Sequence, residues 1–148
     1  MYDRILFPTD GSDGANAALE HAIDHAVTYD AELHVVYVVE ENLPVMEAGQ
    51  AELLETLEAE GEEAIEDARG RAKAAGVASI RGSIGGGSPY RSILKYTEDN
   101  DIDLIVMGTH GRRGIDRYLL GSVAEKVVRS AECPVMTVRA DEDADGEP

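Results

Sequence analysis

Hydrophobic positions along the chain follow two alternating periods. Five short segments carry near-continuous or every-second-residue apolar side chains, as buried strands do; they lie at 2–7, 32–39, 77–84, 102–108 and 134–139. Between them, apolar residues recur every three or four positions, as on one face of a helix, from Ser12 to about Val27 and over 48–75, 88–99 and 118–131. The chain therefore predicts the order β-α-β-α-β-α-β-α-β.

Residues at the ends of these segments support the predicted helices. Ser12 is suited to an N-cap, Ser88 and Pro89 to an N-cap and a first helical position, and Gly76 to a left-handed helix end. Gly61 predicts a kink or loosening in the long second helix. The side chains expected to face the core are Leu53, Leu54, Leu57, Ala64, Ile65, Ala68 and Ala72 in the second helix, and Leu119, Leu120, Val123, Val127 and Val128 in the last.

Helical connections between successive strands predict a parallel sheet, because a parallel strand can be reached only through a crossover. We predict an α/β fold, a single open, doubly wound five-stranded parallel sheet of Rossmann-like type with strand order 3-2-1-4-5. This domain spans 1–139. Residues 140–148, "ADEDADGEP", offer no core-forming side chains and are predicted to be a disordered acidic tail.

The chain is strongly acidic, with 30 Asp and Glu, 13 Lys and Arg, and a net charge of −17. This balance argues against a nucleic-acid partner, since such binding needs a broad basic surface to neutralise phosphates. Only three of the basic residues are lysines, and the chain has one Phe and no Trp. We interpret this composition as halophilic, because screening at high salt removes the self-repulsion of an acidic surface.

Cysteine usage and hydropathy indicate a cytoplasmic protein without a membrane partner. Cys133 is the only cysteine, which excludes an internal disulfide and favours a reducing compartment. No apolar run approaches the ~20 residues that span a bilayer. Cys133 precedes Pro134 and is expected to be a small buried residue beside the last strand.

Two strand ends carry the candidate chemistry. In open parallel sheets, ligands bind at the carboxyl ends of the strands where the strand order reverses, here after the first and fourth strands. The first ends in "PTDGS" (8–12), and the fourth runs into "MGTHGRRGIDRYLLGS" (107–122).

Gly108 and Gly111 let backbone N–H groups approach an anion, and a helix N-terminus adds more. Arg112, Arg113 and Arg117 add charge, against the trend of the whole chain. The pattern indicates a polyphosphate site. The alternative, in which the glycines only form a loop and the arginines pair with surface acids, stays open at this point.

The sequence resembles the universal stress protein family over nearly its whole length. The resemblance rests on "RILFPTDGS" and on "DLIVMGTHGRRGIDRYLLGSVAEKVVRSAECPVMTV". Gly108, Gly111, Gly121 and Ser122 meet the pattern Gly-x2-Gly-x9-Gly-Ser in full, which in that family marks the branch that binds ATP. The resemblance implies the flavodoxin-like, adenine nucleotide alpha hydrolase-like version of the fold.

The resemblance also implies roles for individual residues in binding ATP or another adenine nucleotide. Asp10 would lie near the ribose or a metal, Mg²⁺ or Mn²⁺, and Val38 would contact adenine through its backbone. The other implied nucleotide-lining residues are Pro8, Thr9, Met107, Gly108, Gly111, Gly121, Ser122 and Val123. Thr109 and His110 match the family's loop and are assigned no chemistry. Arg112 and Arg113 lie in its variable part, so their predicted role rests on the charge argument alone.

Three functions remain open: a nucleotide-dependent stress-response or signalling module, a slow ATPase or phosphotransferase, and a chaperone-like dimer with incidental nucleotide. The chain has no Gly-x4-Gly-Lys-Ser/Thr P-loop, and Asp10 is a single carboxylate, so efficient catalysis is not indicated and no catalytic residue is assigned. Family members pair through the last strand. Pro134 cannot donate to a ladder, so Val135–Val138 is expected at an exposed edge that a homodimer covers.

Three histidines have other interpretations. His21 and His25 share a helix face, but "HAIDH" has no evident third ligand, so a solvated pair beside Glu20 and Asp24 is favoured over a metal site. His34 lies within the second strand and is expected to be structural.

Overall fold

The computed structural model describes residues 1–38, 50–110 and 121–140, and of 50–54 the backbone only. It contains the nine predicted elements in the predicted order. The strands are β1 (Arg4–Thr9), β2 (Glu32–Val38), β3 (Ile80–Gly85), β4 (Leu104–Gly108) and β5 (Val135–Val138). The helices are α1 (Asp13–Tyr29), α2 (Gln50–Ala75), α3 (Pro89–Asp99) and α4 (Ser122–Ser130).

The five strands form one parallel sheet in the order β3-β2-β1-β4-β5, which confirms the predicted fold class and strand order. The reversal of strand order therefore falls between β1 and β4. The predicted edge position of β5 is also confirmed, and its four residues are each partly exposed in the single chain.

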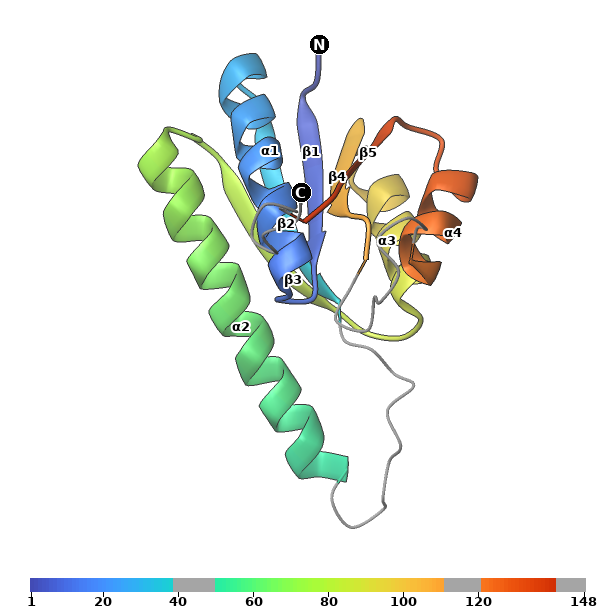
Figure 1. The fold of residues 1–148 in the computed structure, drawn as a ribbon. Coiled ribbons are helices and arrows are strands. Elements are labelled where there is room, and N and C mark those ends of the chain that lie inside the picture. The colour runs from blue at the N-terminus through green and yellow to red at the C-terminus, as the bar shows by residue number, and fades with distance from the viewer. Residues whose placement is uncertain (39–49, 111–120, 141–148) are drawn as a thin grey trace, which may run out of the picture.

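The helices cover both faces of the sheet (Figure 1). On the face covered by α1 and α2, strand residues such as Phe7, Val35 and Val106 pack against the alanine-rich stripe of α1 and the Ile65 face of α2. On the other face, Leu6 and Ile105 belong to a second cluster with residues of α3 and α4. Burial on both faces explains why β1, β2 and β4 are near-continuous apolar runs in the sequence.

The predicted helix ends are largely confirmed. The Ser12 hydroxyl accepts a hydrogen bond from the Ala15 N–H at 3.3 Å, as an N-cap does. Gly76 has φ +105°, and its N–H donates to the Lys73 carbonyl at 3.1 Å. Pro89 opens α3 after Ser88 at the N-cap, although the Ser88 side chain makes no capping bond.

Several predicted bounds were wrong by a few residues. β1 extends past Pro8 to Thr9, because Pro8 is still paired with Val36 of β2. β3 begins at Ile80 rather than at 77. The Val77 N–H still donates to the Ala72 carbonyl of α2, at 3.0 Å. α4 begins at Ser122 rather than 118, because Gly121 has extended dihedrals of φ −68° and ψ 163°.

Two predicted side-chain environments also need correction. Gly61 lies inside α2 with no break in the helix, and its missing side chain makes room for the Tyr37 ring. Val128 is 45% exposed rather than inward-facing, whereas Val127 is buried. The predictions for the side chains of Leu53 and Leu54, for Leu119 and Leu120, and for the tail over 141–148 fall outside the described residues. Among the helices that the structure describes, none is long and apolar enough to cross a membrane.

Candidate functional site

The ladder between β1 and β4 ends before either strand does. Across the described residues it pairs Ile5 with Leu104 and Leu6 with Ile105 and goes no further. Beyond that point β1 stays paired with β2 as far as Thr9, and β4 stays paired with β5 as far as Gly108. The two strands that carry the candidate motifs therefore part at their carboxyl ends, at the position where doubly wound sheets bind ligands.

The loop after β1 is a tight turn held by its own side chains. The Thr9 hydroxyl accepts from the Gly11 N–H, and the Asp10 carboxylate accepts from the Ser12 N–H, both at 3.0 Å. Gly11 takes a positive φ of 82°, which a glycine adopts without strain. Two short polar side chains thus hold the entry to α1, and Asp10 is fixed at the carboxyl edge of the sheet.

Gly108 brings the end of β4 against the start of α1. A side-chain Cβ at Gly108 would lie 3.0 Å from the Gly14 carbonyl oxygen, and one at Gly14 would lie 3.1 Å from the His110 carbonyl oxygen. Both glycines are therefore needed for close backbone packing between the first turn of α1 and the end of β4. This packing places the β1 turn and the β4 loop side by side.

Gly121 joins the same loop to α4. Its N–H donates to the Thr109 carbonyl at 2.8 Å, and a Cβ there would lie 3.2 Å from that oxygen and 3.3 Å from His110 Cα. Because the Gly121 N–H is bonded within the chain, the backbone N–H groups predicted to meet an anion here are those of the first turn of α4. Ser122, the first residue of α4, is exposed.

The predicted site residues that the structure describes all lie at or near the carboxyl ends of β1, β2 and β4 or at the start of α4. Three of them are buried: Pro8, Thr9 and Met107. Those that remain at least partly exposed are Asp10, Val38, Gly108, Gly121, Ser122 and Val123. Gly111, Arg112, Arg113 and Arg117 fall outside the described residues, so the arginine part of the hypothesis stays a prediction.

Asp10 is the predicted metal ligand. Its carboxylate suits a hard divalent cation, but one of its oxygens already accepts from Ser12. In 1–38, 50–110 and 121–140, no three His, Cys, Asp or Glu residues gather closely enough to hold a metal. Within this part of the chain, a metal at Asp10 would therefore need further ligands, such as oxygens of a bound ligand or water.

The helical histidines do not form the predicted solvated pair. His21 is exposed, but His25 is half-buried, with Nδ1 2.8 Å from the His21 carbonyl oxygen. The His25 ring packs against Tyr2 and Tyr29, with ring centroids 6.4 and 6.2 Å away. Cys133 is half-buried beside β5, and burial raises the pKa of its thiol.

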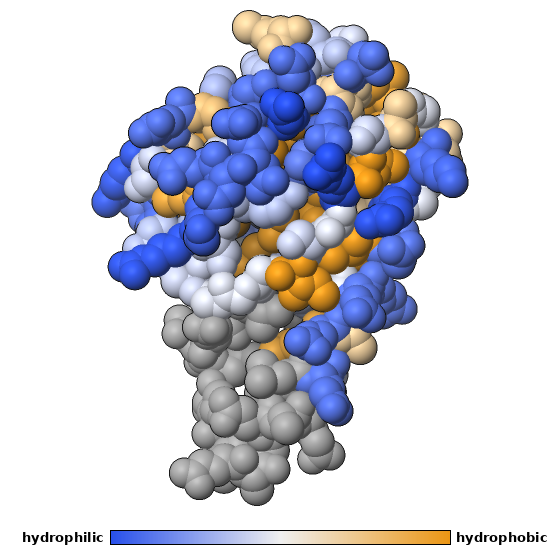
Figure 2. Space-filling model, turned by 180° about the vertical axis from the view of Figure 1, so that it is seen from behind, coloured by the Kyte–Doolittle hydropathy of each residue, from blue (hydrophilic) through white to orange (hydrophobic). Residues whose placement is uncertain are grey.

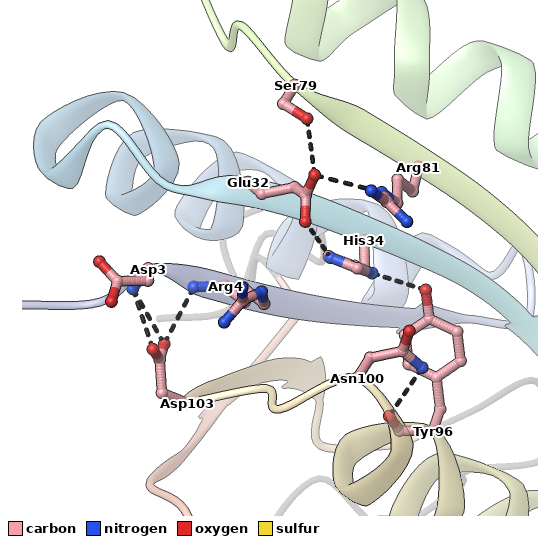
Figure 3. A network of polar contacts seen from close by, with 9 residues as sticks. All are labelled: Asp3, Arg4, Glu32, His34, Ser79, Arg81, Tyr96, Asn100 and Asp103. Atoms are coloured by element: carbon pink, nitrogen blue, oxygen red, sulfur yellow. Dashed lines mark hydrogen bonds and ion pairs between the residues drawn. The ribbon is translucent and has the colours of Figure 1, made fainter.

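A polar network at the start of β2 was not predicted (Figure 3). Glu32 lies 2.8 Å from His34 Nε2 and accepts from the Ser79 hydroxyl at 2.7 Å and from Arg81 Nε at 3.2 Å. The Ser79 bond, together with His34 and Arg81, lowers the pKa of Glu32 to about 2. His34 is buried, and its Nδ1 contacts the Tyr96 hydroxyl of α3, which supports the structural role expected of it.

An open depression of about 360 Å³ lies next to this network, at the amino ends of the strands. It is lined by Asp3, Arg4, Asp30, Ala31, Glu32, Ala78 and Ser79. The carboxylate of Glu32 already has three partners, so it has little bonding capacity left for a ligand. The carboxyl edge, where the motif residues meet, is the better candidate site.

Comparison with known proteins agrees with this fold. The sequence model of the universal stress protein family matches residues 1–139. Universal stress protein MJ0531 of Methanocaldococcus jannaschii is 42% identical over 144 residues, which cover 94% of this chain and 83% of that protein.

Two solved structures extend the comparison. Universal stress protein UspA from Lactobacillus plantarum has a TM-score of 0.81 at 33% identity, with 93% of this chain and 98% of that chain covered. A universal stress protein in complex with cAMP has a TM-score of 0.72 at 26% identity, with 95% and 98% covered. The match over almost the whole chain, together with the shared fold, shows that this chain belongs to the universal stress protein family.

Proposed function

We propose that this chain binds an adenine nucleotide, ATP above all, at the carboxyl ends of β1 and β4, and acts as a nucleotide-dependent stress-response module. The observation that carries the proposal is the meeting of three segments at one point: the Asp10 turn, the Gly108 end of β4 and the Gly121–Ser122 start of α4. In this class of fold, nucleotides bind where the strand order reverses, with phosphate at a helix N-terminus and ribose at a carboxylate.

A structural neighbour in complex with cAMP supports an adenine nucleotide as the ligand. We assign the phosphates to the α4 side, because the positive end of a helix and the exposed Ser122 hydroxyl favour an anion. Asp10 then faces the ribose or a divalent metal carried by the phosphates. Val38, partly exposed at the end of β2, lies on the side proposed for the base.

Hydrolysis is a separate question from binding. Asp10 is the acid that we assign to the proposed site, and its carboxylate is engaged with Ser12 in the turn. A general base must reach the water that it activates. We therefore expect turnover to be slow or absent, and rapid metal-dependent turnover that is lost in Asp10→Ala would favour the enzyme instead.

Variants at Asp10 test where the nucleotide binds. Asp10→Asn keeps an oxygen that can accept from Ser12 but removes the charge, whereas Asp10→Ala also removes the turn bond. We expect Asn to weaken ATP binding about tenfold, the typical loss for one charge-assisted contact, and Ala to weaken it at least as much.

Glu32→Gln, at the amino ends of the strands, is the matched control for calorimetry. It should leave ATP affinity unchanged. An unchanged affinity in both Asp10 variants, or a loss only in Glu32→Gln, would place the nucleotide elsewhere.

The proposed module is a homodimer that pairs through Val135–Val138. These residues form a partly exposed edge strand in the single chain, with a row of backbone groups that a second copy can cover. The Pro134 and Val138 carbonyls accept hydrogen bonds from the β4 segment. Because backbone groups alternate in direction along a strand, those of Val135 and Thr137 face the open edge.

Light scattering at molar salt tests the dimer. The native protein should have the mass of a dimer, and Thr137→Pro should shift it towards a monomer, because proline removes a backbone donor from the open edge. Circular dichroism of the variant checks that the sheet itself remains folded. A monomer mass for the native protein would contradict the proposed pairing.

A further inference from the structure

His110 carries a buried nitrogen at the proposed nucleotide site to which no described residue is hydrogen-bonded. Its Nδ1 lies 3.2 Å from the Thr109 hydroxyl oxygen. Its Nε2 is buried and has no hydrogen-bond partner among the described residues. Buried polar atoms are nearly always bonded, so a nitrogen left unpaired at the edge where a ligand is proposed requires an explanation.

The backbone around His110 is fixed on both sides. The Thr109 N–H donates to the Val138 carbonyl at 3.1 Å, and the Thr109 carbonyl accepts from Gly121 at 2.8 Å. On the other side, the His110 carbonyl oxygen abuts Gly14 at the start of α1. The backbone that carries the imidazole is therefore held between the first turn of α1 and the N-terminus of α4, the second of which we propose as nucleotide-binding.

The orientation of the ring identifies which edge meets the ligand. The His110 Cδ2 atom lies 3.6 Å from the position that a Cβ would take at Gly121, the N-cap of α4. Nε2 is bonded to Cδ2, so the unpaired nitrogen lies at the ring edge near the N-terminus of α4. A helix N-terminus favours an anion, and beside an anion the nitrogen must carry its proton.

We propose that His110 is a binding residue for the nucleotide, with its Nε2–H donating a hydrogen bond to a phosphate oxygen. In this arrangement Nε2 carries the ring proton, so Nδ1, which lies 3.2 Å from the Thr109 hydroxyl oxygen, accepts a hydrogen bond from that hydroxyl. Phosphate binding then satisfies the nitrogen that the described part of the chain leaves without a partner. This inference rests on the proposed nucleotide function and adds to it a named phosphate contact.

Two substitutions of similar size separate a ligand contact from a structural role. His110→Leu removes both ring nitrogens, and His110→Gln keeps an N–H donor at about the position of Nε2. We expect Leu to weaken ATP binding about tenfold and adenosine binding less than about twofold, with Gln recovering part of the loss. Because Leu also removes the contact with the Thr109 hydroxyl, the melting temperature of each variant without nucleotide is the control that separates lost folding from lost binding.

Nitrogen-15 NMR of the imidazoles gives a readout that folding alone would not move. Saturating ATP should shift the Nε2 signal of His110, while His34, whose two nitrogens are already bonded, should serve as the unshifted reference. Equal losses for ATP and adenosine in His110→Leu, or an Nε2 signal unmoved by ATP, would overturn the inference and leave the proposed function intact. Failure of the native protein to bind any adenine nucleotide would overturn both.

Discussion

At the scale of single residues, two glycines of α2 differ in what surrounds them: Gly61 packs against another side chain and Gly70 does not. In α2, a Cβ at Gly61 would lie 2.8 Å from Cδ1 of the buried Tyr37 ring, so this glycine allows the helix to approach β2. Gly70, further along the same helix, has nothing within 4 Å of that position and is exposed. The sequence alone could not separate the two, because their difference depends on what packs against each.

Alanine substitutions should therefore change stability in opposite directions. Gly61→Ala overpacks the Tyr37 contact and should destabilise the protein by about 1–3 kcal/mol. Gly70→Ala, the matched control, should stabilise it by about 0.5–1 kcal/mol, since alanine favours a helix and meets no neighbour. Denaturant unfolding at fixed salt measures both, and a stabilising Gly61→Ala would contradict the packing described here.

At the scale of elements, the apolar periods predicted every strand and helix and their order, but placed their ends less well. Strand limits depend on which backbone groups find a partner, as when Pro8 remains paired in β1 and Val77 closes α2 instead of opening β3. The carboxyl ends of β1 and β4 were predicted as the site because parallel strands and a strand-order reversal bring them together. The Glu32 network could not be predicted, since His34 and Tyr96 are separated by 62 positions and meet only through the sheet and α3.

Glu32 connects β2 to β3 and, through His34, to α3, and this connection should depend on pH. Its folded-state pKa of about 2 lies below the ordinary 4.5, so the unfolded chain binds more protons between these values. The stabilisation is complete above about pH 4.5 and is lost as the pH falls through about 2.

Glu32→Gln should cost about 1–2 kcal/mol at neutral pH, since the carboxylate is partly exposed and screened. The gap in melting temperature between native protein and variant should close from about pH 5 to about pH 2. Glu63→Gln, an exposed carboxylate of α2, is the control that should change little. If the difference in melting temperature between native protein and Glu32→Gln does not change with pH, the charge of Glu32 does not stabilise this network.

At the scale of the whole molecule, charge dominates the surface. Figure 2 shows one face of the molecule. Hydrophilic residues cover much of this face, and hydrophobic residues gather near its centre. With a net charge of −17, the folded chain repels itself unless salt screens it. We therefore predict that the stability of the fold depends on salt, independently of the site.

The melting temperature should accordingly fall by several degrees when KCl is lowered from molar to millimolar concentration. The measurement needs a nucleotide-saturated control, because a ligand that binds the folded state stabilises it by mass action. If the melting temperature is flat across this range, the interpretation of the chain as salt-adapted is wrong.

The carboxyl edge, in our proposal, binds an adenine nucleotide through its phosphates, at the start of α4 and beside His110. Calorimetric titration of the native protein with ATP and with adenosine, at the same high salt, tests it most directly. We predict that ATP binds at least about tenfold more tightly than adenosine, since charge-assisted contacts to phosphate have no counterpart in the nucleoside. Equal affinities for the two ligands, or no binding of ATP at millimolar concentration, would contradict it.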